Sequence, residues 1–129
     1  MKRNRKLLLK TARRITKVPE SYNQHEWVMD SDRSPCGTVA CLAGEIIICS
    51  EPTVKKGVER LKDIYHGEGS VATEAIELTG LDEDDEDALF YSPKTWPNGI
   101  GKRFARKTKV EKAKAAAELL RYLADGGEV

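Results

Sequence analysis

The sequence predicts an all-α protein, and three observations lead to this fold class. Apolar residues recur at spacings of three and four along several segments, residues that cap helices precede most of these segments, and prolines and glycines separate them. The chain has 129 residues, the length of one domain with its own core. We therefore expect one compact helical domain, residues 1–129, with five to six helices around a central buried helix.

The first element, residues 1–19, reads as a basic amphipathic helix. Basic residues fill the positions between its apolar ones, and Pro19 ends it. The apolar positions are Leu8, Leu9, Ala12 and Ile15. A core region, residues 20–97, follows, and it begins with a polar loop that Tyr22 and Trp27 are expected to anchor.

The stretch "PCGTVACLAGEIIICS" is the most apolar part of the chain and predicts the central helix. Thr38 is a suitable N-cap, and the residues that follow, as far as Cys49, are apolar on nearly all sides, as in a buried helix. A buried strand over "EIIICS" is the alternative, because β-branched residues are dense there.

The rest of the core region predicts further helices. "TVKKGVERLKDIYHG" follows Pro52 and places Val54, Val58, Leu61 and Tyr65 on one face. Ser70 caps a short helix that runs to Thr79, Gly80 ends it, and Asp82 caps the next helix. The segment "YSPKTWPNGIG" is interpreted as an irregular connection.

The last element is a C-terminal helix over residues 108–125. Thr108 and Glu111 form a capping-box pattern at its start, and Gly126 closes it.

Charge is strongly segregated along the chain. Residues 1–17 carry eight Lys or Arg and no acid, residues 18–101 carry six basic against seventeen acidic residues, and residues 102–114 carry seven basic residues and one acid. Such a pattern produces a basic and an acidic face if the two basic segments meet in space. No segment has the composition of a secretory signal or a membrane span, so we expect a cytoplasmic protein that does not contact membranes.

Part of the core region resembles a group of small, uncharacterised proteins encoded by bacteriophages and prophages. The shared features are Trp27, "CGTVACLAG" at residues 36–44, "ATEAIELTGL" at 72–81, "ALF" at 88–90 and "TWP" at 95–97. The resemblance implies no known activity. It implies a phage-type origin, host cytoplasm as the location, and a non-enzymatic protein that binds host components.

The three cysteines suggest chemistry that we weigh against a structural role. A zinc site is one interpretation. The spacing of Cys36 and Cys41 is compatible with zinc, and Cys49, His25 or His66 would complete the set of ligands. In one helix, however, Cys41 and Cys49 would lie about 12 Å apart along the axis, too far to share an ion. As the third residue of a helix capped by Thr38, Cys41 would have a lowered thiol pKa, as in a cysteine enzyme.

A structural role accounts for the cysteines best, because free cysteine is among the residue types most often buried. We therefore expect no catalytic residue, metal or cofactor, with a cysteine or zinc enzyme as the minority alternative. The preferred function is binding of a protein or another macromolecule through a charged surface. The candidate binding residues are Trp27, Cys36, Thr38, Cys41 and Trp96, and the candidate basic surface is Arg13, Arg14, Lys102, Arg103 and Arg106.

Nucleic acid is the alternative partner, gripped by the basic N- and C-terminal helices. The helical corner around residues 72–90 has the spacing of a helix-turn-helix, but its second helix begins with six acids that DNA would repel. We therefore interpret this corner as two helices packed in the core and not as a DNA-binding motif. The oligomeric state stays open.

Overall fold

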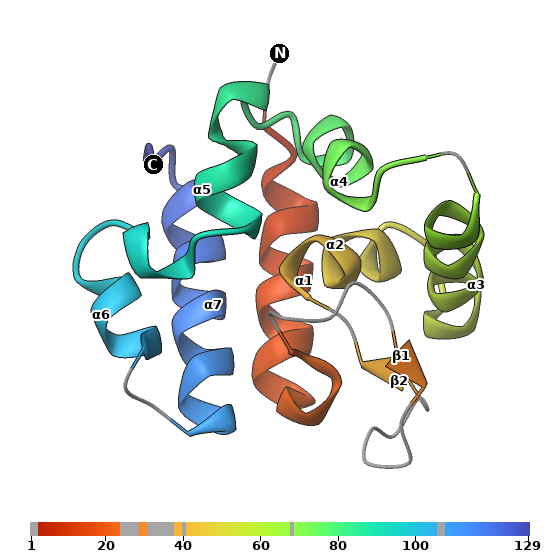
Figure 1. The fold of residues 1–129 in the computed structure, drawn as a ribbon, viewed down its shortest axis with the longest axis horizontal. Helices are drawn as coiled ribbons and strands as arrows, with labels where there is room; N and C mark the ends of the chain where they lie inside the picture. Colours follow the sequence, from red (N-terminus) through yellow and green to blue (C-terminus); the bar gives the residue numbers. More distant parts are fainter. Residues whose placement is uncertain (1–2, 24–28, 31–37, 40, 68, 106–107) are drawn as a thin grey trace.

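The fold is all-α, as the sequence predicts. A computed structural model describes residues 3–23, 29–30, 38–39, 41–67, 69–105 and 108–129. These residues hold seven α-helices, one more than the upper expected number, and a single pair of two-residue strands (Figure 1).

The elements follow one another with short connections. The helices are α1 (Arg5–Lys17), α2 (Leu42–Cys49), α3 (Val54–His66), α4 (Val71–Thr79), α5 (Glu86–Phe90), α6 (Ile100–Ala105) and α7 (Lys109–Ala124). Single 3₁₀ turns are η1 (Pro19–Ser21), η2 (Glu83–Asp85) and η3 (Pro93–Thr95), and the strands are β1 (Met29–Asp30) and β2 (Thr38–Val39).

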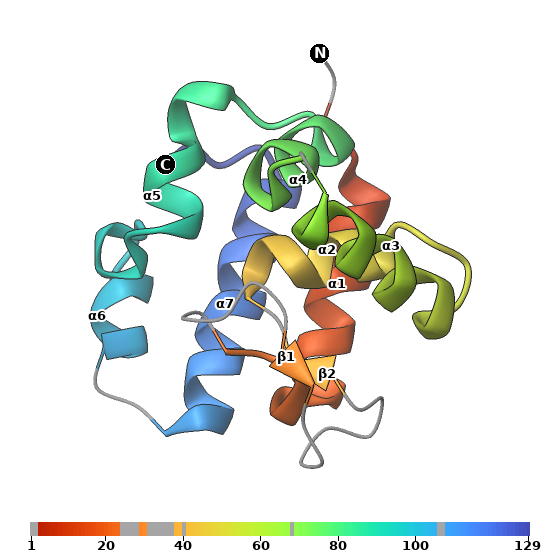
Figure 2. The same cartoon turned by 45° about the vertical axis from the view of Figure 1, so that its right-hand side comes forward.

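Helix α2 is the central buried helix. All eight of its residues are buried, and it packs against α1, α3 and α4. Figures 1 and 2 show it enclosed between these three helices. The prediction of a buried helix is thus confirmed, and the alternative of a strand over "EIIICS" is wrong.

The predicted start of this helix is wrong. Residues 38 and 39 belong to β2, which pairs antiparallel with β1 so that Met29 faces Val39 and Asp30 faces Thr38. The N-cap of α2 is Cys41, whose backbone is extended, and not Thr38. The pairing of β2 with the nearby strand β1 keeps its backbone extended, and local capping preference does not reveal such a pairing.

Helices α1 and α7 lie side by side and bring the two ends of the described chain together. Leu8, Ala12 and Ile15 of α1 are buried as predicted, whereas Leu9 is only partly buried and Leu7 and Thr11 are buried with them. Before the helix, Arg3 donates hydrogen bonds to the carbonyls of Leu123 (2.9 Å) and Gly127 (2.5 Å). The two basic segments therefore lie on neighbouring helices.

Four residues predicted to begin or end helices do so in the structure. Ser70 and Thr108 accept hydrogen bonds from the backbone at the starts of α4 and α7. Gly80 adopts the left-handed conformation (φ +71°) that ends α4, and the Asp82 side chain caps η2, which leads into α5.

The predicted irregular connection over residues 91–101 is confirmed as far as Gly99, but Ile100 and Gly101 belong to α6, a helix not predicted from the sequence. Asn98 and Gly99, both at positive φ, complete a turn before it. The predicted apolar face of α3 is wrong in part. In α3, Val54 and Tyr65 are exposed and only Leu61 and Gly57 are buried. Among the described residues, no helix combines the length and apolarity needed to cross a membrane.

Gly57 sets how closely α3 approaches α2, since a Cβ added there would collide with the Ile48 carbonyl. Replacement of a helical glycine by alanine normally stabilises a helix by about 1 kcal/mol. We expect Gly57→Ala to lower the free energy of unfolding instead, by roughly 1–3 kcal/mol, because the helices must separate. Thermal unfolding followed by circular dichroism measures this. Lys56→Ala, at the exposed neighbouring position, is the control, and a Gly57→Ala protein as stable as wild type would contradict the packing.

Candidate functional site

Cys41 is a buried thiol in the core. It is 2% exposed, and burial raises the pKa of its thiol to about 12. The expectation of a lowered pKa depended on Cys41 lying in the first turn of the helix, whereas the residue is the N-cap and is closed off from solvent. The thiol is therefore protonated at neutral pH and does not have the reactivity of a catalytic cysteine.

Cys49 lies at the opposite end of α2 and is also a free, buried thiol, with its pKa raised by burial to about 11. One helix separates the two cysteines, as expected, so they do not share an ion. Nowhere in the described ranges do three His, Cys, Asp or Glu side chains gather as metal ligands. Cys36 and His25 lie outside those ranges.

The remaining predicted binding residues do not form a described site. Trp27 and Cys36 fall outside the described residues, and Thr38 is described only as part of β2. Trp96 is 3% exposed, and its indole N–H donates to the carbonyls of Ala88 and Leu89, both at 3.1 Å. Its ring meets Phe104 edge to face with the centroids 5.0 Å apart. Trp96 therefore belongs to the core and not to an open surface.

A buried ion pair joins α1 to α2. Glu45, the one charged residue of α2, is fully buried and accepts hydrogen bonds from Arg14 Nε (2.6 Å) and Ser21 Oγ (2.8 Å). Burial raises the pKa of the Glu45 carboxyl to about 7, although Arg14 and Ser21 oppose the shift. Arg14 thus acts as a structural partner inside the fold.

The predicted basic surface is divided by the structure. Arg14 is held by Glu45, and Arg103 forms an ion pair with Glu118 (2.6 Å). Arg13 and Lys102 are exposed, and Arg106 lies outside the described residues.

The exposed side of α7 carries both charges, at Glu111, Lys114, Glu118 and Arg121. The two basic segments lie on helices that pack together, but α7 does not present a uniformly basic face.

One side of α1 does present only cations. We call it the α1 face and define it by Lys6, Lys10, Arg13 and Lys17, all exposed. At 1.5 Å per residue the four charges span about 16 Å along the helix. Lys6, Arg13 and Lys17 form no ion pair with any described residue, and Lys10 donates to the Glu51 carbonyl at 3.1 Å. A helical-wheel analysis of residues 5–17 would have identified these three lysines, which sequence reasoning did not single out.

A groove runs beside the α1 face, formed by two adjoining hollows. The first has a volume of about 250 Å³, and its lining includes Lys6, Leu7 and Leu78. The second has a volume of about 300 Å³, and its lining includes Lys17, Ile48 and Val54. Lys10 and Cys49 line both, so the hollows meet where α2 ends.

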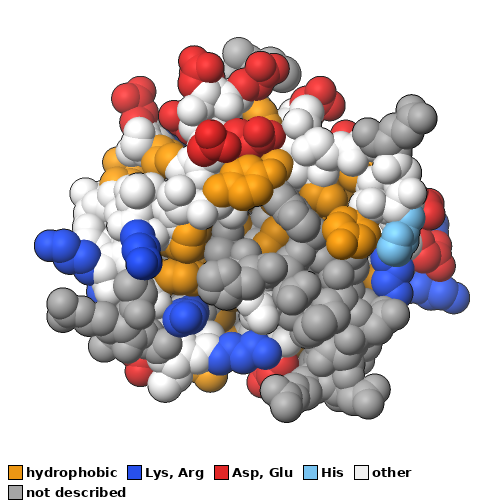
Figure 3. All heavy atoms as spheres, viewed as in Figure 1, with side chains coloured by type: hydrophobic (Ala, Val, Ile, Leu, Met, Phe, Trp, Pro, Cys, Tyr) orange, Lys and Arg blue, Asp and Glu red, His pale blue; other side chains and the backbone are white. Residues whose placement is uncertain are grey.

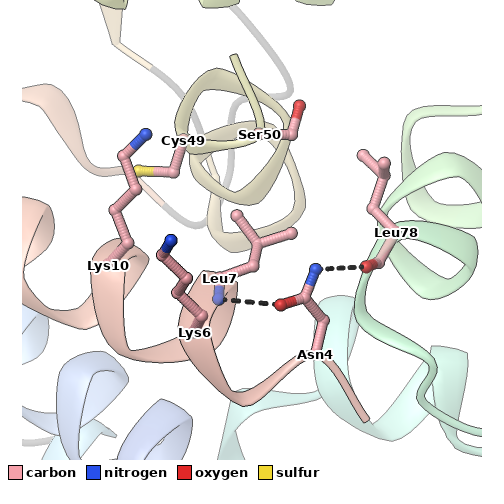
Figure 4. A pocket seen from close by; sticks show the side chains of 7 residues that line it. All are labelled: Asn4, Lys6, Leu7, Lys10, Cys49, Ser50 and Leu78. Atoms are coloured by element: carbon pink, nitrogen blue, oxygen red, sulfur yellow. Dashed lines mark hydrogen bonds between the residues drawn. The ribbon is translucent and has the colours of Figure 1, made fainter. Parts of the chain in front are cut away.

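Figure 4 shows the first hollow from close by. Lys6 and Lys10 extend from α1 toward the end of α2, where Cys49 and Ser50 lie. Asn4 closes one end, because its side chain accepts from the Leu7 N–H (3.1 Å) and donates to the Leu78 carbonyl (3.3 Å). The groove therefore has an apolar floor and a cationic rim.

Acidic side chains occupy a separate part of the surface. Asp82, Glu83, Asp84 and Asp87 are exposed around η2 and α5. Figure 3 shows acidic side chains gathered at the top of one face and basic ones at its left and lower parts, while both kinds lie together at its right edge. The charge segregation in the sequence is therefore kept in part in space.

Comparison with known proteins does not add a family to this description. No family model, curated protein or solved structure matches the chain. The resemblance to small phage-encoded proteins stays a prediction.

The burial of both thiols predicts their reactivity. Cys41 and Cys49 should resist alkylation by iodoacetamide at mildly alkaline pH in the folded protein and react fully once it is unfolded, because the protonated thiol is a poor nucleophile. Mass spectrometry of proteolytic fragments distinguishes the two sites. Rapid labelling of Cys41 in the folded protein would contradict its assignment to the core.

The Glu45 carboxyl predicts a pH dependence of stability. In the unfolded chain it titrates near 4.5 and in the folded protein near 7, so within this range the folded state binds more protons. The free energy of unfolding should therefore fall as the pH rises from about 4.5 to 7, by at most about 1.4 kcal/mol per pH unit from this group.

Urea unfolding across this pH range tests the assignment. Glu45→Gln should remove the contribution of this residue to the fall of the free energy of unfolding with pH, since glutamine does not titrate. Glu118→Gln, which alters an exposed ion pair, serves as the control and should keep the wild-type slope. If the Glu45→Gln protein kept that slope as well, the raised pKa of Glu45 would be refuted.

Proposed function

We propose that this chain is a non-catalytic binding protein whose α1 face contacts an acidic region of a partner protein. The observation that carries the proposal is the α1 face itself, four exposed cations on one side of a single helix. Charged groups arranged in this way steer oppositely charged partners and set specificity more than affinity.

The neighbouring groove supports a protein partner. Protein surfaces offer apolar side chains beside carboxylates, and the groove places apolar residues such as Leu7 and Val54 beside cations. The suppressed reactivity of Cys41 and Cys49 favours a binding role over cysteine chemistry. The resemblance to phage-encoded proteins favours a host component as the partner.

Nucleic acid is the second candidate, because cations along a helix also bind phosphates. Two of the arginines expected to grip phosphates are held by carboxylates, Arg14 by Glu45 and Arg103 by Glu118. α7 mixes both charges on its exposed side, and the short helix α6 exposes only Lys102 and Arg103, so α1 carries the longest row of exposed cations on a described helix. These features favour an acidic protein surface over a long phosphate backbone.

Charge reversal tests the proposal. The triple variant Lys6→Glu, Arg13→Glu, Lys17→Glu should bind a labelled Glu/Ala peptide at least about tenfold more weakly than wild type, because each reversal replaces attraction by repulsion. Fluorescence anisotropy at about 0.15 M salt measures the affinity.

The matched control reverses three exposed lysines away from the α1 face, Lys94→Glu, Lys102→Glu and Lys109→Glu. It makes the same change in net charge and should keep most of the affinity for the peptide. An equal loss in both variants would show that net charge alone governs binding. Tighter binding of a short DNA duplex than of the peptide by the wild-type protein would favour the nucleic-acid function instead.

A further inference from the structure

The groove beside the α1 face specifies more than the charge of its ligand. Its cationic rim is provided by α1, and its other wall by the end of α2 together with Leu78 of α4 in the first hollow and the start of α3 in the second. Glu51, which is paired with Arg60, also lines the second hollow. Apolar groups form much of the floor, with Leu7 and Leu78 in the first hollow and Ile48 and Val54 in the second. The occupant must therefore combine apolar groups with negative charge.

The division of the groove into two small hollows favours separate side chains over one drug-sized molecule. The volume of each hollow, about 250 and 300 Å³, lies near the lower end of small-molecule sites, which range over roughly 300–1,000 Å³. Each hollow suits one or two apolar side chains. Two such hollows in a row are typical of a surface that receives side chains from one segment of polypeptide.

The spacing of the hollows suggests the conformation of that segment. On α1 the first is bordered by Lys6 and Lys10 and the second by Lys10 and Lys17, so their midpoints lie about 8 Å apart along α1. Two turns of an α-helix advance about 11 Å, and one turn about 5 Å. The separation of the hollows lies between these two values, so apolar side chains on one face of a helix, at positions i, i+3 or i+4, and i+7, bracket it.

We infer that the groove binds an amphipathic helix of a partner protein, with leucine-like side chains in the two hollows and carboxylates along its flank facing Lys6, Lys10 and Lys17. The inference rests on the proposed function, since the same lysines attract the acidic partner. It adds that apolar contacts and their helical spacing determine which acidic segments bind. Charge complementarity selects this occupant over a basic or uncharged helix.

Three synthetic peptides test the inference. Each has about 15 residues, a length at which an isolated helix is only marginally stable in water, so none of the peptides is strongly biased toward a helix before it binds. The first carries Leu at i, i+3, i+7 and i+10 with Glu on the flanks. The second has the same composition with Leu distributed around the helix. The third has Ala in place of Leu and the same charge. Isothermal titration calorimetry with the wild-type protein should give the first peptide at least about tenfold higher affinity than either of the others.

A pair of matched variants locates the contact. Val54 and Val110 are exposed valines, each in the first turn of a helix, but only Val54 lines the groove. Val54→Asp should weaken binding of the first peptide by about tenfold, because it removes an apolar contact and places a like charge beside the ligand. Val110→Asp, with the same change in charge, should alter the affinity less than about twofold.

The outcomes separate this inference from the proposed function. If the three peptides bind with equal affinity, and Val54→Asp and Val110→Asp change the affinity for the first peptide by the same factor, the groove inference is overturned and charge-driven binding stands. If the peptide with distributed Leu binds as well as the first, the helical spacing is refuted. If none of the three peptides binds, the proposed function fails together with the inference.

Discussion

The burial of α2 on every side is the constraint on which the rest of the structure depends. A helix without a solvent-facing side needs neighbours all round, and α1, α3 and α4 provide them. Gly57 lets α3 lie against the backbone of Ile48, and Arg14 reaches inward to the carboxylate of Glu45. Since the desolvation of Glu45 is costly when it is charged, its two hydrogen bonds fix α1 and η1 against α2.

Local signals in the sequence predicted the fold class, the buried helix, and the ends of α4 and α7, because caps and terminators act within a few residues. Contacts between separate elements could not be predicted in this way. Pairing with the nearby strand β1 moved the start of α2 from Thr38 to Cys41, and the partner of Glu45 lies on another helix. The groove was missed for the same reason, since it forms only where α1 meets the end of α2.

Arginines and lysines have different roles in this protein. Arg5, Arg14, Arg60 and Arg103 all pair with carboxylates, and Arg60 joins Glu51 of the α2–α3 connection to Glu74 of α4. The planar guanidinium suits such fixed geometry, whereas the lysine ammonium is a flexible, hydrated charge. Lys6 and Lys17 of α1 form no ion pair among the described residues, and Arg13 is the arginine that shares their place on the α1 face, while these four arginines link neighbouring elements. Composition alone counts both as basic and does not distinguish these roles.

The packing of α1 against α7 has a consequence for how the protein is made. The two helices lie about 100 residues apart in sequence, so their contact closes nearly the whole described chain. During synthesis, which proceeds from the N-terminus, α1 emerges long before α7 exists to pack against it. The buried side of α1 therefore lacks one of its neighbours until α7 has left the ribosome.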